Sequence, residues 1–444
     1  MNICLVGAFP PSGRQLNEYA FHIASALRRD PLVNLTILAD ELTRYEFATD
    51  KDGNPLATES QEELPGFRVI RCWKFNHLTT PARLLNTIRW LKPDVVWFNL
   101  VFSTFATQEH PLPAFAGLCV PALARALGCY THVTLHHILE HVDFAGAGVQ
   151  QEKIFRLGSD MATRVLLKAN SVSVLLSAYQ RTLLQKYSAA NVLLGTHGVF
   201  ASCPSAPDFS LRGNPEQRIL AIGHWGTYKR LETLMEAFPT VLQRVPNARL
   251  VIAGANHHTK PGYWESIQQA HKDESRIEFR GYVPEDAIPD LFRNSSIVVM
   301  PYDSATGSSG PAHQACEYGV PMVCADIPDL RTMAADEDMA IRFYRTGAAS
   351  DLADKLSEVL ESPQLQREMA AQNFSAAVRM TMPEVVRQYL RWFALVERKS
   401  SLGSATRVLS FQRWSRNRWR SAAMRPASGL VQDATSVAGR VTLV

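Results

Sequence analysis

Hydroxyl-bearing residues and glycines fill a short turn between two apolar runs, SIVVMPY and MVCADIP. Because proline favours the first turn of a helix, we expect a helix to begin near Pro311, with Ser308 or Ser309 as its N-cap. The free backbone N–H groups at such a helix start can bind phosphate or sugar oxygens. The turn therefore predicts a ligand site formed by Thr306, Ser308, Ser309 and Gly310, and Gln314 follows in the helix.

A basic pair follows another apolar run, RILAIG, within the segment HWGTYKR. A strand ending at Gly223 and a helix starting near Lys229 would place Lys229 and Arg230 at a helix N-terminus, where the helix dipole disfavours cations. A bound diphosphate would remove that conflict, because its negative charge would lie between the cations and the helix end. The alternative is a solvated basic pair without a ligand. We predict a diphosphate site at Lys229 and Arg230.

Two segments of the first half also end expected strands in residues suited to ligand binding. After NICLVGA comes FPPSGRQ, in which Gly13 would let an anion approach the backbone; the alternative is an ordinary turn. The segment THVTLHHILEH carries His132, His136, His137 and His141, but no carboxylate or cysteine pattern completes a metal site. We therefore predict no metal, and we interpret His136 as a polar contact to a sugar-like ligand.

Composition narrows the class of protein. The chain has 444 residues, of which 46% are hydrophobic and 20% charged, so packed cores are expected and global disorder is not. None of the seven cysteines forms a Cys-x-x-Cys pair, which argues against a disulfide framework or a zinc site and favours a reducing compartment. The start MNICLVGAF is not a signal peptide, and no uncharged apolar stretch is long enough to cross a bilayer. We expect a soluble, cytoplasmic protein, and we interpret the acidic run Asp336–Asp338 as solvated surface.

Short β-rich runs alternate with amphipathic helical stretches, and the alternation restarts once. Fully apolar strands between helices are typical of parallel sheets covered on both faces. We predict an α/β protein with two doubly wound Rossmann-like domains facing across a cleft, with the ligand at the carboxyl ends of strands. The predicted parts are an N-terminal domain at 1–200, a linker at 201–217, a C-terminal domain at 218–382, a helix at 383–398 that packs back toward the N-terminal domain, and a basic tail at 399–444.

The net charge of +4 is unevenly distributed. From Lys399 onward there are eight Lys/Arg and one acid, a balance of 8 − 1 = +7, so the rest of the chain carries 4 − 7 = −3. A mildly acidic body argues against nucleic acid as a partner. In the tail, Val408, Phe411, Trp414 and Trp419 fall on one helical face. Two interpretations stay open: a disordered basic tail, or an amphipathic segment in peripheral contact with an anionic membrane surface.

Taken in order, several of these segments resemble the family 4 glycosyltransferases, of the group 1 type. These are retaining enzymes with the two-domain GT-B fold. The resemblance covers roughly residues 1–395 and rests on a series of motifs rather than on any single one. The segments that carry it are FPPSGRQLNEYAFHIASAL, VTLHH, NVLLGTHGVF, IGHWGTYKRLETLMEAF and EYGVPMVCADIPDL.

The resemblance implies a role for individual residues. Lys229 falls on the lysine that binds the donor diphosphate, Gly13 on the glycine near the distal phosphate, and His136 on the histidine near the transferred sugar. The chain also departs from the family. His224 stands where an arginine is usual, His197 replaces the asparagine of an Asn-Gly-Val, and Thr306 and Gln314 stand where the family has two glutamates eight positions apart.

The implied activity is transfer of a sugar, with retention, from a nucleotide-diphosphate sugar to a saccharide or lipid-linked acceptor, in surface polysaccharide or glycoconjugate biosynthesis. The resemblance implies no cofactor and no metal beyond the donor substrate. Two alternatives stay open. One is a nucleotide-sugar enzyme such as a GT-B-shaped epimerase. The other is a catalytically weak or inactive GT-B protein that acts as a nucleotide-sugar binding or assembly partner, which the neutral Thr306 and Gln314 favour.

Overall fold

The computed structural model describes residues 1–42, 66–107, 109–142, 152–209, 216–257, 260–304 and 307–398. The chain divides into two compact units, Met1–Gln388 and Tyr389–Val444. Both sheets lie in the first unit, and residues 382–398 are helical across the division. The bounds of the predicted domains, linker and C-terminal helix stay predictions, and the basic tail lies outside the described residues.

The first half contains a seven-stranded sheet with the order β3-β2-β1-β4-β5-β6-β7, in which every pairing is parallel. Its central strand β4 is buried along its whole length, because helices cover both faces of a parallel sheet. The elements are β1 (Asn2–Val6), α1 (Asn17–Leu27), β2 (Asn34–Asp40), β3 (Val69–Trp73), α2 (Thr80–Leu91), β4 (Val95–Leu100), α3 (Pro111–Leu118), α4 (Val120–Ala126), β5 (Tyr130–Leu135), η2 (Leu139–His141), α5 (Glu152–Leu166), β6 (Ser171–Val174), α6 (Ser177–Tyr187) and β7 (Val192–Leu194).

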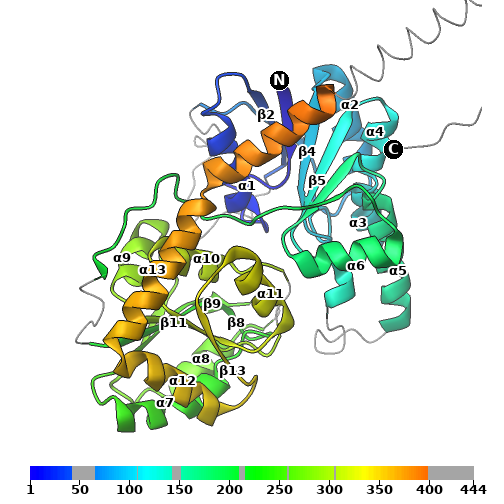
Figure 1. Ribbon diagram of the computed structural model, residues 1–444. Helices are drawn as coiled ribbons and strands as arrows, with labels where there is room; N and C mark the ends of the chain where they lie inside the picture. Colours follow the sequence, from blue (N-terminus) through cyan, green and yellow to red (C-terminus); the bar gives the residue numbers. More distant parts are fainter. Residues whose placement is uncertain are drawn as a thin grey trace, which may run out of the picture. The chain divides into compact units, whose positions relative to one another are not determined.

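The second half contains a six-stranded, all-parallel sheet with the order β10-β9-β8-β11-β12-β13. Figure 1 shows α7 and α12 together on one side of this sheet and α10 and α11 on the other. The elements are β8 (Arg218–Trp225), α7 (Glu232–Arg244), β9 (Arg249–Asn256), α8 (Tyr263–Ala270), β10 (Ile277–Gly281), η4 (Glu285–Ala287), α9 (Ile288–Arg293), β11 (Ile297–Met300), α10 (Gly310–Glu317), β12 (Met322–Ala325), α11 (Pro328–Glu337), β13 (Ile341–Tyr344), α12 (Ala349–Glu361) and α13 (Pro363–Arg379).

Both sheets have the strand order of a doubly wound Rossmann-like fold, so this part of the prediction is confirmed. In such sheets the chain order reverses between two central strands, here β1 and β4 in the first sheet and β8 and β11 in the second. Connections leave these neighbouring strands in opposite directions, and the space outside their carboxyl ends receives ligands. The segments that follow β1, β8 and β11 are therefore the first places to look for a site.

The two halves are joined by a short parallel bridge between Val199 and Thr381, next to the end of α13. The backbone N–H of Val199 donates to Met380, and that of Met382 donates back to Val199. Gly198 has a φ of +82°, and a Cβ there would lie 2.9 Å from the Val385 side chain. Glycine is required at this close approach, which accounts for the Gly198-Val199 pair in the sequence.

Candidate functional site

The residues predicted to bind a ligand follow the carboxyl ends of four strands. Gly13 comes after β1, His136 after β5, Lys229 after β8 and Ser308 after β11. Three of these strands, β1, β8 and β11, lie at the switch points of the two sheets. A doubly wound fold binds ligands outside the carboxyl ends of such strands. Thr306, predicted to belong to the same site, lies outside the described residues.

Lys229 is a half-buried cation whose nearest neighbours are aromatic rings rather than carboxylates. Its Nζ lies 5.0 Å from the ring centroid of Tyr302 and 6.0 Å from that of Tyr228. Desolvation by burial lowers the pKa of the Lys229 ammonium to about 8. Among the described residues, no ion pair forms with it. Desolvation of a charge without a counter-charge destabilises the folded protein, and such charges are often found where they bind an anionic ligand.

The Lys229 side chain is positioned by its turn and by the strand that the turn follows. The N–H of Gly226 donates to the Lys229 carbonyl over 3.0 Å, and Lys229 forms an antiparallel bridge with Tyr302 after β11. A Cβ on Gly223 would lie 3.8 Å from Nζ, so the lysine stem runs along this glycine of β8. The turn therefore holds Nζ at the carboxyl end of β8.

Arg230 and His224 are placed differently from Lys229. The Arg230 guanidinium is exposed and lies 3.0 Å from Glu232 and 3.7 Å from Asp303, so its charge is already compensated. His224 is an exposed residue within β8. The helix expected to start near Lys229 begins at Glu232, because the closed turn from Gly226 to Lys229 delays it. The expected start of this helix was therefore wrong. Arg230 forms ion pairs, whereas Lys229 forms none with the described residues.

The turn after β11 leads into α10 as predicted. The helix begins at Gly310 with Pro311 in its first turn, and the Ser309 hydroxyl accepts a hydrogen bond from the N–H of Ala312. The Ser308 Oγ is buried and has no hydrogen-bond partner among the described residues. Gln314 is half-buried one turn into the helix. Among the described residues, the Ser308 hydroxyl thus keeps unused hydrogen-bonding capacity near the start of α10.

Gly307 brings this turn into contact with the first half of the chain. It has a φ of +82°, and a Cβ there would lie 2.6 Å from the His136 carbonyl oxygen. Its N–H lies 2.6 Å from the Tyr179 hydroxyl and 3.2 Å from Asp329 Oδ2, and Tyr179 itself donates to that carboxylate. His141 lies 3.4 Å from Asp329 Oδ1. The turn after β11 is thereby fastened to the carboxyl end of β5.

His136 is buried at this junction and is neutral. Desolvation by burial, with a smaller contribution from neighbouring His137, lowers the pKa of His136 to about 3. Its Nε2 lies 2.7 Å from Asn99 Oδ1, and Tyr19 packs edge-on against its ring. A neutral imidazole beside an amide oxygen must carry its proton on Nε2, so His136 acts as a hydrogen-bonding group rather than a charge.

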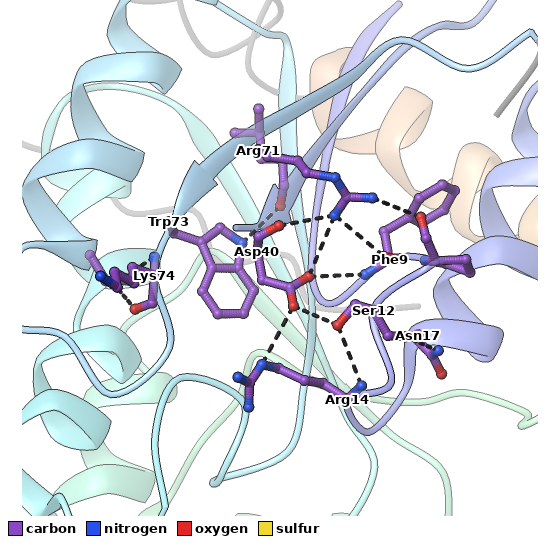
Figure 2. A network of polar contacts seen from close by, with 11 residues as sticks. Phe9, Ser12, Arg14, Asn17, Asp40, Arg71, Trp73 and Lys74 are labelled. Atoms are coloured by element: carbon purple, nitrogen blue, oxygen red, sulfur yellow. Dashed lines mark hydrogen bonds and ion pairs between the residues drawn. The ribbon is translucent and has the colours of Figure 1, made fainter. Parts of the chain in front are cut away.

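The loop after β1, which carries Gly13, is organised by Asp40 at the end of β2 (Figure 2). The Asp40 carboxylate accepts hydrogen bonds from the Ser12 hydroxyl at 2.5 Å and from the N–H of Phe9 at 3.3 Å. Arg14 lies 3.5 Å from the same carboxylate. Arg71 donates to the carbonyls of Asp40 and Pro10, so both ends of the loop are held. Gly13 is exposed at its tip.

Asp40 was not foreseen from the sequence, because its partners come from two other segments, the loop after β1 and strand β3. The only available signal was an acidic residue ending the apolar run NLTILAD. A strand that is buried in its last residues and ends in a carboxylate must bring that carboxylate to a donor.

A second buried acid, Glu337, overturns the interpretation of Asp336–Asp338 as solvated surface. Glu337 ends α11, and its side chain is only 6% exposed. Its Oε2 lies 2.8 Å from Nε2 of His313, whose side chain is 2% exposed. Asp336 and Asp338 are exposed, as predicted, but the Glu337 side chain between them is buried.

The histidines of THVTLHH do not form a metal-ligand group among the described residues. His132 is buried between the hydroxyls of Ser171 and Ser173, at 2.8 and 3.1 Å. The one potential group in the described part of the chain is Glu18, His22 and Glu285, whose ligand atoms all lie within 4.8 Å of one another. Two of these residues come from α1 and the third from η4, so their proximity depends on tertiary structure. The expectation that no metal is needed stays a prediction.

Solved structures of other proteins show which fold the chain has. HepE of Anabaena in complex with UDP-glucose is 15% identical, with a TM-score of 0.63 over 89% of this chain and 99% of that chain. Sucrose-phosphate synthase from Thermosynechococcus elongatus is 14% identical, with a TM-score of 0.66 over 90% and 100%. The lipopolysaccharide outer core galactosyltransferase WaaB is 14% identical, with a TM-score of 0.56 over 89% and 100%. The chain thus has the GT-B fold of glycosyltransferases, with two Rossmann-like domains.

The sequence supports the same class more narrowly. Residues 216–362 match the family described as "Glycosyl transferases group 1". This segment contains β8 to β13, together with Lys229, the turn after β11 and α10. No curated protein sequence matches the chain. No helix in the described part of the chain is long and apolar enough to cross a membrane.

Proposed function

We propose that the protein is a glycosyltransferase that moves a sugar, with retention, from a nucleotide-diphosphate sugar to a saccharide or lipid-linked acceptor. The observation that carries the proposal is Lys229, a desolvated cation with no acidic partner among the described residues, at the carboxyl end of β8. The group 1 glycosyltransferase match covers this segment. The complexes of HepE with UDP and with UDP-glucose support a uridine nucleotide as the first donor to test.

The chemistry of the bond to be broken explains why such a cation is needed. When the bond between the anomeric carbon and the diphosphate breaks, negative charge grows on the departing phosphate and positive charge on the sugar ring. A preorganised cation in a poorly solvated site stabilises the growing phosphate charge more than it stabilises the bound substrate. Lys229 is assigned this role, and the start of α10 would add backbone N–H groups.

The remaining residues are assigned to holding the donor. Ser308, Ser309 and Gly310 lie at the N-terminus of α10, where sugar or phosphate oxygens would be bound, and Gln314 would contact the ribose hydroxyls. The Gln314 amide can accept one hydrogen bond and donate another, whereas a carboxylate would accept two. Gly13 would lie near the distal phosphate and His136 near the transferred sugar. His224 and Arg230 are assigned to the rim of the diphosphate site, since Arg230 already pairs with Glu232.

The acceptor and the cellular setting are inferred from the composition of the C-terminal tail. The basic, tryptophan-containing tail suits contact with an anionic membrane surface, and such contact would suit a lipid-linked acceptor in polysaccharide assembly at the cytoplasmic face. The proposed reaction uses no cofactor and no metal, because Lys229 and the helix N-terminus supply the positive potential at the diphosphate.

The test is a turnover assay with UDP- and GDP-sugars, with and without acceptor extracts, on the wild-type chain and on Lys229→Met. We expect slow hydrolysis or transfer by the wild type, and a loss of about 10²–10³-fold in the variant, the range seen when one preorganised charge-stabilising group is removed. Lys272→Met, a change at an exposed residue, is the control. Near-normal turnover by Lys229→Met would contradict the assignment.

A second candidate function is a binding protein for nucleotide sugars without transferase activity. The neutral Gln314 in the donor helix favours it, because a neutral hydrogen bond stabilises less than a charged one by about 1–2 kcal/mol. Tight binding of a nucleotide sugar with no turnover, in the presence of every acceptor extract, would select this function.

A further inference from the structure

The ring of His313 lies in the interior with both of its nitrogens facing acceptors. Nδ1 lies 2.7 Å from the Ser309 carbonyl oxygen, and Nε2 lies 2.8 Å from Glu337 Oε2, an ion-pair distance without the angle of a hydrogen bond. A neutral imidazole has a single N–H and would leave one acceptor facing a nitrogen lone pair. The doubly protonated imidazolium matches both acceptors when Glu337 is ionised, so the geometry favours a positive charge on His313.

The groups around His313 agree with a single buried cation. The ring of His197 lies 4.3 Å away, centroid to centroid, and the pKa of His197 is held well below its usual value by burial and by the neighbouring histidines His313 and His136. The Cys316 thiol on the same helix stays neutral, because burial and the nearby Glu337 raise its pKa. For His313, burial favours the neutral ring, but Glu337 and the Ser309 carbonyl together outweigh burial and raise the pKa. Glu337 is therefore the counter-charge.

Helix α11 holds the turn after β11 at both of its ends. In its first turn, Asp329 accepts hydrogen bonds from the N–H of Gly307 and from Tyr179. Its last residue, Glu337, pairs with His313 in the first turn of α10. The segment from Gly307 to His313, which contains the N-terminus of α10, is thus attached to one rigid helix before and after the proposed ligand-binding turn.

The contacts continue from His313 to the other half of the site. His197, which packs against His313, accepts a hydrogen bond at its carbonyl from the Tyr19 hydroxyl over 2.8 Å. Tyr19 in turn packs edge-on against His136, with ring centroids 4.5 Å apart. A change in charge at His313 would therefore act on a packed chain of rings that ends at His136.

We propose that protonated His313, held by Glu337, is a positioning residue that fixes the turn Gly307–Gly310 and Gln314 in the arrangement that binds the nucleotide sugar. The role rests on the proposed function, although the charge of His313 does not. His313 itself is too deeply buried to touch the substrate, so it acts through the backbone carbonyl of Ser309 and the direction of α10. Loss of the proton would leave Glu337 without its counter-charge and release the first turn of α10.

The experiment compares the wild type with Glu337→Gln, which keeps the shape of the side chain and removes its charge. Histidine-selective ¹⁵N NMR reports the protonation of His313 directly. We expect both ring nitrogens to be protonated at pH 7 in the wild type and His313 to be neutral at that pH in the variant. Calorimetry of UDP-glucose binding should then show constant affinity from pH 5.5 to 7 for the wild type. At pH 7 the variant should bind UDP-glucose about tenfold more weakly than the wild type, because its His313 is neutral.

Two controls separate the possible failures. Glu361→Gln, at an exposed carboxylate paired with Arg244, should leave the pH dependence of binding unchanged. A neutral His313 in the wild type at pH 7 would overturn the inference even if the nucleotide sugar binds. So would a folded Glu337→Gln variant that binds UDP-glucose as tightly at pH 7 as the wild type does. If the wild type binds no nucleotide sugar, the proposed function and the positioning role both fall, while the NMR result still decides whether His313 is charged.

Discussion

The turns that follow β1 and β8 occupy equivalent places in the two sheets, and at each a poorly solvated charge lies near the carboxyl end of the sheet. In the first, the fully buried Asp40 carboxylate faces Arg14 and Arg71 and accepts hydrogen bonds from Ser12 and Phe9. In the second, Lys229 faces the rings of Tyr228 and Tyr302. Asp40 thus has counter-charges and hydrogen-bond donors within the protein. Lys229 has no acidic partner among the described residues.

The difference separates a structural charge from a functional one. A buried charge with hydrogen bonds and counter-charges stabilises the conformation around it, and its removal leaves its partners uncompensated. A buried charge without them costs stability until a ligand arrives. The comparison therefore assigns Asp40 to the shape of the Gly13 loop and Lys229 to the binding of an anion.

The largest expected effect is on the structural side of the comparison. Asp40→Asn should lower the free energy of unfolding by about 3–5 kcal/mol, because Arg14 and Arg71 would face a neutral group in the interior. Denaturant unfolding followed by circular dichroism measures the change. Asp273→Asn, at an exposed position, is the matched control and should change stability by less than about 0.5 kcal/mol. Equal stability of the two variants would show that the Asp40 network is not structural.

A smaller effect is expected from Gln314, which is assigned to binding but carries no charge. Gln314→Ala should weaken nucleotide-sugar binding by about 5–30-fold, the equivalent of one to two kcal/mol for the lost hydrogen bonds. Calorimetric titration with UDP-glucose measures it. Gln268→Ala on α8, an exposed helical position, should bind as the wild type does. If both variants bind equally well, Gln314 does not belong to the donor site.

The sequence predicted those features that depend on local pattern. Apolar runs such as RILAIG and SIVVMPY became β8 and β11, and the alternation with helices predicted two doubly wound sheets. Lys229 and the Ser309 cap were identified because both follow a strand directly, and the fold then fixes their place. The start of α7 was misplaced by a few residues, because the turn at Gly226 closes through backbone hydrogen bonds that no side-chain pattern announces.

Features that depend on distant partners were not predictable. Asp40 meets Arg71 across the end of a parallel pair of strands, and Glu337 meets His313 across two helices. From a single sequence, an acidic residue that is buried in the fold cannot be told from exposed acidic residues beside it, as Glu337 within Asp336–Asp338 illustrates. The contact of Gly307 with His136 likewise depends on how the two halves of the first unit meet, since their positions in the chain are far apart.

The most direct test of the central claim is the uptake of protons when a nucleotide sugar binds. Burial lowers the pKa of Lys229 to about 8, so near pH 8 about half of the free protein carries the charge. A bound diphosphate favours the charged form and raises that pKa, so binding must take up protons at pH 8, and affinity must fall as the pH rises above 8. Calorimetry of UDP-glucose binding in buffers of different ionisation enthalpy measures this uptake. We expect about half a proton per ligand at pH 8 for the wild type, close to none at pH 6, and none for Lys229→Met at either pH. Equal proton uptake by the wild type and Lys229→Met at pH 8 would contradict the claim that Lys229 binds the diphosphate.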